Sequence, residues 1–281
     1  CSVVLVCASL GVVAANLTHT GLEYWLSPEQ MLFFGWRIAF IGGGLIIFHS
    51  YLARVTLYES ETFKEIQHAK KNKEGAIQQI AKNYKALMLF VFFTQAGIAS
   101  YWGILVAYLP AYCAEYCTLS TIQFAELMLV MAICIPIGNI LGGLIADWIG
   151  IKKAYLIYSI IMLIIIMPIF NYIMNDAVPM INVLVLMGGF ALLTGLMNGT
   201  ANYFSANIFP AEIRYSSVAI IQSVGMALFA GLAPLYVSSL THYFNDTMMP
   251  AKVLTIAYAV QVVAVLVIVL FLKKLKAPTE N

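Results

Sequence analysis

The chain has 281 residues, of which 62% are hydrophobic and only 10% are charged, and its mean hydropathy is +0.89. A water-soluble domain carries about 25% charged residues, so this composition excludes a soluble globular protein and predicts a membrane protein. The formal net charge is only +2, so we expect no nucleic acid or other acidic partner.

Eight apolar stretches approach the length of about 20 residues with which a helix crosses the hydrocarbon of a bilayer. We therefore predict an all-α polytopic membrane protein with the lipid bilayer as its solvent. An outer-membrane barrel would instead show short segments that alternate apolar and polar residues. In chain order, the predicted spans are 1–17, 34–55, 86–110, 122–146, 154–173, 180–208, 215–240 and 253–272.

Lysine and arginine are concentrated in alternate loops. The segment 54–85 carries seven of them, the loop after the fourth span carries Lys152 and Lys153, and the tail from residue 273 carries three. The loops at 111–121 and near residue 175 carry none. Because cytoplasmic loops are enriched in lysine and arginine, we predict a multi-pass plasma-membrane protein, of the bacterial inner-membrane type, whose long loop and C-terminus are cytoplasmic.

The segment 56–85 is the clearest break in this pattern, with two predicted spans before it and six after it. We expect residues 1–55 to be the last two helices of one bundle, 56–85 a central loop, 86–272 a six-helix unit and 273–281 a cytoplasmic tail. The alternative is that 56–85 is a plain solvated loop. Because the chain begins inside an apolar run and without Met, we expect it to be the C-terminal portion of a longer protein.

Small residues and charges follow one another where the fourth span ends. Gly138 and Gly142 lie one helical turn apart, a spacing that lets a second helix approach closely. The turn that follows contains Gly143, Asp147, Gly150, Lys152 and Lys153.

This turn resembles the loop signature G-x-x-x-D-x-x-G-[RK]-[RK] of the major facilitator superfamily, with Ile151 in place of the first basic residue. In that superfamily the signature follows the second and the eighth of twelve helices. The resemblance implies that the eight spans are helices five to twelve and that 56–85 is the loop between two six-helix halves. It also implies that helices one to four are a missing partner of this chain.

Other segments resemble one branch of the superfamily, the metabolite:proton symporters, which include proline/betaine transporters and carriers of α-ketoglutarate, citrate and shikimate. Gly35–Phe40 is similar to the GWRIPF segment that opens helix six in this branch. Further similar segments are Glu59–Phe63 at the start of the central loop, Phe209–Tyr215 between helices ten and eleven, and Gly231–Pro234 in helix eleven.

The resemblance implies proton-coupled symport of a small organic solute, without a cofactor or a metal. No lysine or arginine lies deep in a predicted span, which favours a zwitterionic osmolyte or amino acid such as betaine or proline over a carboxylate. Two alternatives remain open. One is an organic-acid symporter, and the other is a truncated chain without transport activity of its own.

In this family, helices seven, eight, ten and eleven line the central cavity. The polar and aromatic residues that they carry here are Gln95, Tyr101, Trp102, Tyr108, Asn139, Asn198, Asn202 and Gln222. We expect Tyr101 and Trp102 to make cation–π contacts with an ammonium group and the amides of Asn198, Asn202 and Gln222 to bind a carboxylate. The alternative is that the aromatic rings face lipid and that the amides tie helices together.

Four charged residues have predicted roles in coupling or gating. Glu126 lies inside the fourth span, where an ionisable group is costly, so it is a candidate proton-linked site. By resemblance, Asp147, Glu212 and Arg214 form a cytoplasmic charge cluster that holds one conformation. An intramembrane enzyme is not expected, because the four histidines are scattered and no pair of aspartates lies within the spans.

Overall fold

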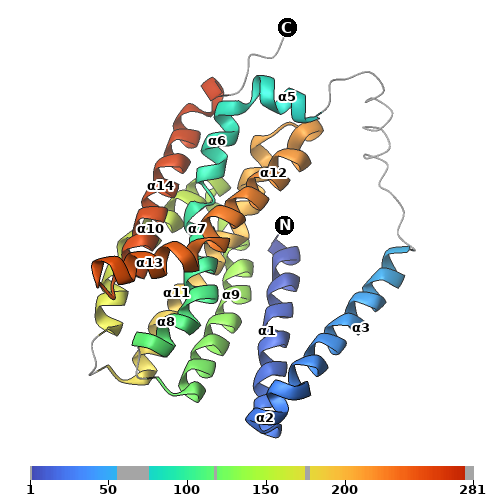
Figure 1. Cartoon of the computed structure of the whole chain (residues 1–281). Coiled ribbons are helices and arrows are strands. Elements are labelled where there is room, and N and C mark those ends of the chain that lie inside the picture. The colour runs from blue at the N-terminus through green and yellow to red at the C-terminus, as the bar shows by residue number, and fades with distance from the viewer. Residues whose placement is uncertain (1, 56–75, 117–118, 175–177, 276–281) are drawn as a thin grey trace. The chain divides into compact units, whose positions relative to one another are not determined.

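The structure, a computed structural model, describes residues 2–55, 76–116, 119–174 and 178–275. All regular elements in these residues are helices, which confirms the predicted all-α fold (Figure 1). The chain divides into two compact units, one formed by residues 1–9 and 76–281, called unit 1 below, and one formed by residues 10–75, called unit 2.

Unit 2 contains most of α1 (Ser2–Trp25), followed by α2 (Pro28–Gln30), the π-helical stretch η1 (Met31–Gly35) and α3 (Trp36–Val55). Because η1 continues directly into α3, the second predicted span begins a few residues earlier than expected. At this junction the guanidinium of Arg37 lies 4.4 Å from the centre of the Trp36 ring. Arginine and tryptophan both favour the membrane interface, so this pair is suited to anchor the start of α3 there.

The third predicted span is a membrane helix interrupted in two places. It runs through α6 (Lys85–Phe93), α7 (Ala96–Tyr101), the π-helical stretch η3 (Trp102–Tyr108) and α8 (Leu109–Tyr116). The predicted end at about Pro110 lies three residues before the end of the membrane-length stretch Lys85–Cys113, and the helix itself continues to Tyr116. Proline is tolerated in the first turn of a helical segment, and Pro110 is the second residue of α8.

The remaining spans are long helices. They are α9 (Thr121–Ile149), α10 (Ile151–Ile173), α11 (Met180–Ile208), the interrupted helix α12 (Ala211–Gly225) with η4 (Met226–Gly231) and α13 (Ala233–Phe244), and α14 (Met249–Leu275). Within the described residues, seven helical stretches are long and apolar enough to cross a membrane. They match the second to the eighth of the predicted spans, and the first predicted span, 1–17, falls in α1.

Turns at the two ends of unit 1 have recognisable causes. Between α9 and α10 the chain reverses at Gly150, whose φ of +88° is a conformation that favours glycine. Between α13 and α14 it reverses at Asn245, whose φ of +48° is left-handed, as asparagine tolerates. We call the ends that carry these two turns the Gly150 end and the Asn245 end.

Helices α9 and α11 pack closely against each other through glycines. A Cβ atom placed on Gly138 would lie 2.2 Å from the backbone oxygen of Leu192, and one on Gly142 would lie 2.2 Å from that of Leu196. From the opposite side, a Cβ atom on Gly195 would lie 2.3 Å from a backbone oxygen of α9, and one on Gly199 would lie 2.5 Å from another. The predicted close approach at Gly138 and Gly142 is confirmed, and its partner is the matching pair of glycines on α11.

Part of the predicted central loop is helical. The short helix α5 (Ala76–Asn83) packs against α12 and buries Ile80, whereas Ile77 faces outward. Residues 56–75, which include the segment Glu59–Phe63, and the end of the tail at 276–281 lie outside the described residues. The compact units meet in the chain at two points, between residues 9 and 10 and between residues 75 and 76.

Candidate functional site

The break between α6 and α7 lies at Thr94 and Gln95, two buried polar residues. The Thr94 hydroxyl donates to the backbone oxygen of Val91 at 2.6 Å, and the Thr94 backbone oxygen accepts a hydrogen bond from the Tyr155 hydroxyl at 2.6 Å. Backbone polar groups freed by a break inside a membrane must find partners in the protein. Here the side chains of Thr94, at the break, and of Tyr155, on α10, supply them.

The candidate solute ligand Gln95 is tied to a neighbouring helix. Its side-chain nitrogen donates to the hydroxyl of Ser205 on α11 at 3.0 Å, and Gln95 is only 8% exposed. Its side chain also packs against Gly225 at the end of α12. In this conformation Gln95 joins three helices, which corresponds to the structural alternative that we considered from the sequence.

Tyr101 and Trp102 lie in contact but differ in access. The two rings meet edge to face with their centres 6.0 Å apart, and Tyr101 also packs against Phe190 with ring centres 5.8 Å apart. Tyr101 is completely buried, whereas Trp102 is half-buried. Of the two rings, that of Trp102 keeps some exposed surface, and its contact with a solute stays a prediction.

Asn202 and Gln222, which lie 20 residues apart, are brought together. The side-chain nitrogen of Gln222 on α12 donates to the side-chain oxygen of Asn202 on α11, and both residues are half-buried. The third amide, Asn198, lies half-buried one helical turn before Asn202 on α11. The three predicted carboxylate ligands thus lie on two neighbouring helices.

Asn139 on α9 is fully buried at the crossing with α11. Its side-chain nitrogen donates to the Ser9 hydroxyl at 3.0 Å, and its backbone oxygen lies where a Cβ on Gly199 would be only 2.5 Å away. These contacts are those of a residue that joins helices. Its side-chain oxygen makes no hydrogen bond in the described part of the chain.

Tyr108 lines a cavity of about 300 Å³ towards the Asn245 end of unit 1. The rings of Tyr108, Tyr112 and Tyr116 follow one another along the helix, with centres 5.9 and 5.1 Å apart, and all three residues line this cavity. The other lining residues are mostly apolar and come from η3, α8, α9, α10, α11 and α14 and from the adjoining turns. Tyr108 therefore lines a cavity within unit 1.

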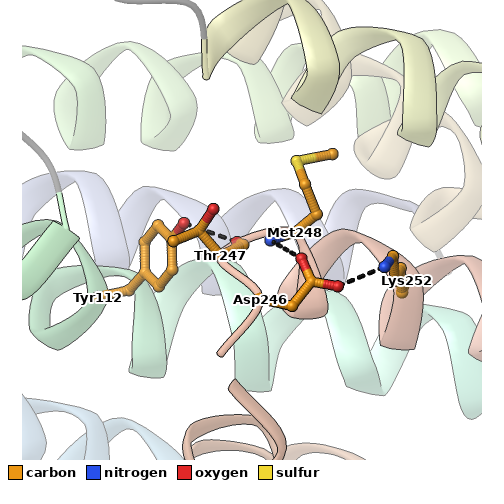
Figure 2. Close-up of polar contacts among 5 residues, drawn as sticks. All are labelled: Tyr112, Asp246, Thr247, Met248 and Lys252. Carbon is orange, nitrogen blue, oxygen red and sulfur yellow. Dashed lines mark hydrogen bonds and ion pairs between the residues drawn. The ribbon is translucent and has the colours of Figure 1, made fainter. Parts of the chain in front are cut away.

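The turn between α13 and α14 is attached to Tyr112, a residue that lines this cavity (Figure 2). The Tyr112 hydroxyl donates to the backbone oxygen of Thr247 at 2.8 Å. Asp246 accepts from the backbone N–H of Met248 at 2.8 Å and forms an ion pair with Lys252. The Lys252 ammonium and the Met248 N–H hold the pKa of Asp246 below its usual value.

The charged candidates lie at exposed positions. Glu126 is exposed near the start of α9, and Asp147, Glu212 and Arg214 are exposed at the Gly150 end. The side-chain nitrogen Nε of Arg214 donates to the Phe209 backbone oxygen at 3.3 Å. Among the residues that the structure describes, no ion pair joins Asp147, Glu212 and Arg214 to one another, so their cluster stays a prediction.

The loop motif shapes the turn between α9 and α10. Gly150 forms the reversal itself, while Lys152 and Lys153 are exposed in the first turn of α10 and Gly143 is half-buried one turn before Asp147. The motif predicts a positively charged turn with a backbone conformation that glycine adopts easily, and the observed turn has both features. Its role in gating stays a prediction.

Sequence reasoning missed a second set of buried polar residues. Gln261 on α14, Ser159 and Tyr155 on α10 are fully buried and hydrogen-bond to one another or to the break in α6–α7. The signal was present, because Gln261 is a polar residue in the middle of the apolar run 253–272, and polar residues at membrane depth are functional candidates.

Unit 1 is thus a bundle of membrane-length helices, two of which are interrupted where polar or small residues meet. A Cβ on Gly103 in η3 would lie 2.5 Å from the backbone oxygen of Ala230 in η4, so the two π-helical stretches are in contact. Discontinuous helices packed together at membrane depth are typical of secondary transporters. The class defined by this fold is a multi-pass membrane protein of transporter type.

Comparison with known families agrees with this class. Residues 3–234 match the family model described as Major Facilitator Superfamily. The match covers most of the chain, and the protein belongs to this superfamily. The resemblance read from the motif at Gly143–Lys152 is confirmed.

Three relatives with assigned names can be compared with the chain individually. The chain is 30% identical over 263 residues to a putative proline/betaine transporter of Staphylococcus aureus, which covers 92% of this chain and 54% of the relative. It is 25% identical over 231 residues to the inner membrane metabolite transport protein YhjE of Escherichia coli, covering 81% of this chain and 52% of the relative. With the citrate-proton symporter of Salmonella typhi it shares 24% identity over 245 residues, covering 86% and 55%.

The chain therefore spans about half the length of the curated relatives that it matches. The names of these relatives are consistent with the metabolite:proton symporter branch. They are the names of transporters rather than of enzymes.

Proposed function

We propose that this chain is part of a secondary active transporter that moves a small organic solute across a membrane together with protons. The observation that carries this proposal is the superfamily match over residues 3–234. Its geometric support is the pair of interrupted helices, α6–α8 and α12–α13, which are in contact through η3 and η4. Interrupted helices that pack together at membrane depth are typical of secondary transporters.

We further propose that the solute is a zwitterion of the betaine or proline type. The ring of Trp102 would face the ammonium group, and the amides of Asn198, Asn202 and Gln222 would bind the carboxylate. In support, the described lysines and arginines of unit 1 lie at helix ends and turns, where they cannot neutralise a polyanion at mid-membrane. The relative with 30% identity is named as a putative proline/betaine transporter.

Uptake of radiolabelled betaine and proline tests this proposal. Cells without their own osmolyte uptake would express the 281-residue chain alone or joined to the part of the Staphylococcus aureus relative that it does not cover. Saturable uptake that an imposed proton gradient accelerates is the expected result. Uptake of citrate or α-ketoglutarate, unaffected by excess betaine, would replace the zwitterion with an organic acid, for which the Salmonella typhi relative is the precedent.

The comparison of the two forms tests the remaining alternative. If only the joined form transports solute, the 281-residue chain has no transport activity of its own and needs helices supplied by a longer protein. If the chain alone transports solute, the missing helices are not required.

For proton coupling we propose Glu126 on α9. A carboxylate exposed near the end of a membrane helix is reached by protons from that side, and its neutralisation would change the charge that moves with the solute. Glu126→Gln is expected to remove the acceleration by a proton gradient while leaving solute exchange at equal pH intact. An unchanged response to the gradient would dismiss Glu126 as the coupling site.

A further inference from the structure

The side chain of Gln261 makes several hydrogen bonds that are not part of the proposed solute site. Gln261 lies in the middle of α14 and is completely buried. Its side-chain oxygen Oε1 accepts hydrogen bonds from two backbone N–H groups of α7, those of Gly97 at 3.0 Å and Ile98 at 3.2 Å. One amide side chain thus reaches from the last membrane helix to the interior of the third predicted span.

These two N–H groups need a partner outside their own helix. The first N–H groups of any helix have no acceptor within it, and α7 begins immediately after the break at Thr94 and Gln95. At this depth water is not available to replace the missing acceptors. Gln261 therefore caps the start of α7 in the way that a side chain of the same helix would do in a soluble protein.

Hydrogen bonding of the side-chain nitrogen sets the orientation of the Gln261 amide. Its nitrogen Nε2 donates to the Ser159 hydroxyl at 2.9 Å, and that hydroxyl donates to the backbone oxygen of Tyr155 at 2.8 Å. The Tyr155 hydroxyl in turn holds the Thr94 backbone oxygen at 2.6 Å. The hydrogen bonds therefore connect α10, α14 and both sides of the break.

Steric contact adds to these hydrogen bonds. A Cβ atom on Gly97 would lie 2.5 Å from the ring of Tyr258 and 2.6 Å from Oε1 of Gln261. Only glycine lets α7 approach α14 at this point. The segment α7 consequently packs directly against one turn of α14, from Tyr258 to Gln261.

The segment α7 is followed directly by η3, and the rings of Tyr101 and Trp102 lie where the two join. Tyr101 is the last residue of α7, and Trp102, the first residue of η3, meets its ring edge to face with centres 6.0 Å apart. We propose that Gln261 is a positioning residue for solute binding: it fixes α7 on α14 and thereby orients the Trp102 ring towards the solute. The part of this inference that concerns the affinity for the solute rests on the proposed function.

The variant Gln261→Met tests the inference, because methionine keeps the length of the side chain but accepts no strong hydrogen bond. Hydrogen–deuterium exchange of the peptide containing Gly97 and Ile98, measured on the full chain in detergent or nanodiscs, is expected to become about tenfold faster or more, as expected for the loss of one or two hydrogen bonds. In the transport assay, KM for betaine should rise about tenfold while the maximal rate stays within about twofold, the pattern of lost binding rather than lost turnover.

Two matched variants separate positioning from general destabilisation. Gln261→Glu retains the acceptor oxygen and, in its neutral form, a donor for Ser159, so it should restore both exchange protection and KM. Thr255→Val removes a hydroxyl from the same helix that bonds only within α14, to the Ala251 backbone oxygen at 2.8 Å, and should change neither quantity.

Unchanged exchange at α7 in Gln261→Met would overturn the inference, as would an equal rise of KM in Thr255→Val. Failure of the proposed function looks different. If the unaltered chain and its joined form show no saturable uptake of betaine or proline, the zwitterion proposal fails. The effect on affinity is then overturned, whereas the exchange measurement still decides whether Gln261 fixes α7.

Discussion

At the scale of single residues, backbone contact leaves no room for side-chain atoms at the α9–α11 crossing. A Cβ on Gly142 would lie 2.2 Å from the Leu196 backbone oxygen, which cannot rotate away as a side chain would. Gly142→Ala is therefore expected to lower the free energy of unfolding by about 1–3 kcal/mol, as overpacking usually does.

Gly189→Ala is the matched control, because Gly189 lies on α11 with nothing within 4 Å of its Cβ position. It should leave stability unchanged or raise it slightly, since alanine favours helix. Thermal unfolding of both variants in the same detergent makes the comparison. Equal melting temperatures for Gly142→Ala and the parent would contradict the close crossing.

A second residue-scale prediction concerns pH at the α13–α14 turn. The pKa of Asp246 is lowered by the Lys252 ammonium and the Met248 N–H. A carboxyl group with a lowered folded-state pKa stabilises the structure above its unfolded-state pKa, and the contribution is lost as the pH falls through the folded-state value. The turn should therefore be insensitive to pH down to about 4 and loosen below it.

The emission of a fluorescent probe on Thr247→Cys, in a variant without the native cysteines, would report this loosening. Asp246→Asn should show a looser turn at neutral pH and no acid transition below about pH 4. A transition of the parent that begins well above pH 4 would show that a group other than Asp246 controls the turn.

At the scale of elements, α5 depends on one apolar side chain for its attachment to unit 1. Ile80 is 6% exposed and Ile77 is 69% exposed, although both belong to the same short helix. A helix of eight residues is not stable by itself in water, so burial against α12 must hold it.

Ile80→Asn is consequently expected to release α5, whereas Ile77→Asn should not. Hydrogen–deuterium exchange of the peptide 76–83 should become much faster in the first variant only. The same exchange rate in both variants would show that α5 is held by something other than this burial.

At the scale of the whole molecule, the charge pattern predicts that the Gly150 end is cytoplasmic and the Asn245 end external. Single cysteines at Thr247 and Lys153, introduced after the native cysteines are replaced, test this. A membrane-impermeant maleimide should label Thr247→Cys in intact cells and Lys153→Cys only after permeabilisation. The reverse pattern would invert the topology and move Glu126 to the cytoplasmic side.

Much of the helical organisation follows from local sequence. The predicted span 180–208 coincides with α11, and most other spans agree to within a few residues, because continuous apolar length alone decides whether a segment crosses a bilayer. The apolar pattern did not indicate how far the third helix extends or where the backbone departs from regular helix. Pro110 did not end its span, and α6–α8 and α12–α13 are interrupted.

Composition, apolar length and the spacing of short motifs by themselves determined the membrane class, the spans and the superfamily, because each is a local property of the chain. Only the tertiary structure decided which polar side chains are engaged. Gln95 bonds to Ser205, 110 residues away, and Gln261 bonds to Gly97, 164 residues away. Such pairs depend on which helices become neighbours, and all these helices are similarly apolar. No local pattern therefore separates an amide that joins helices from one that is free to bind a solute.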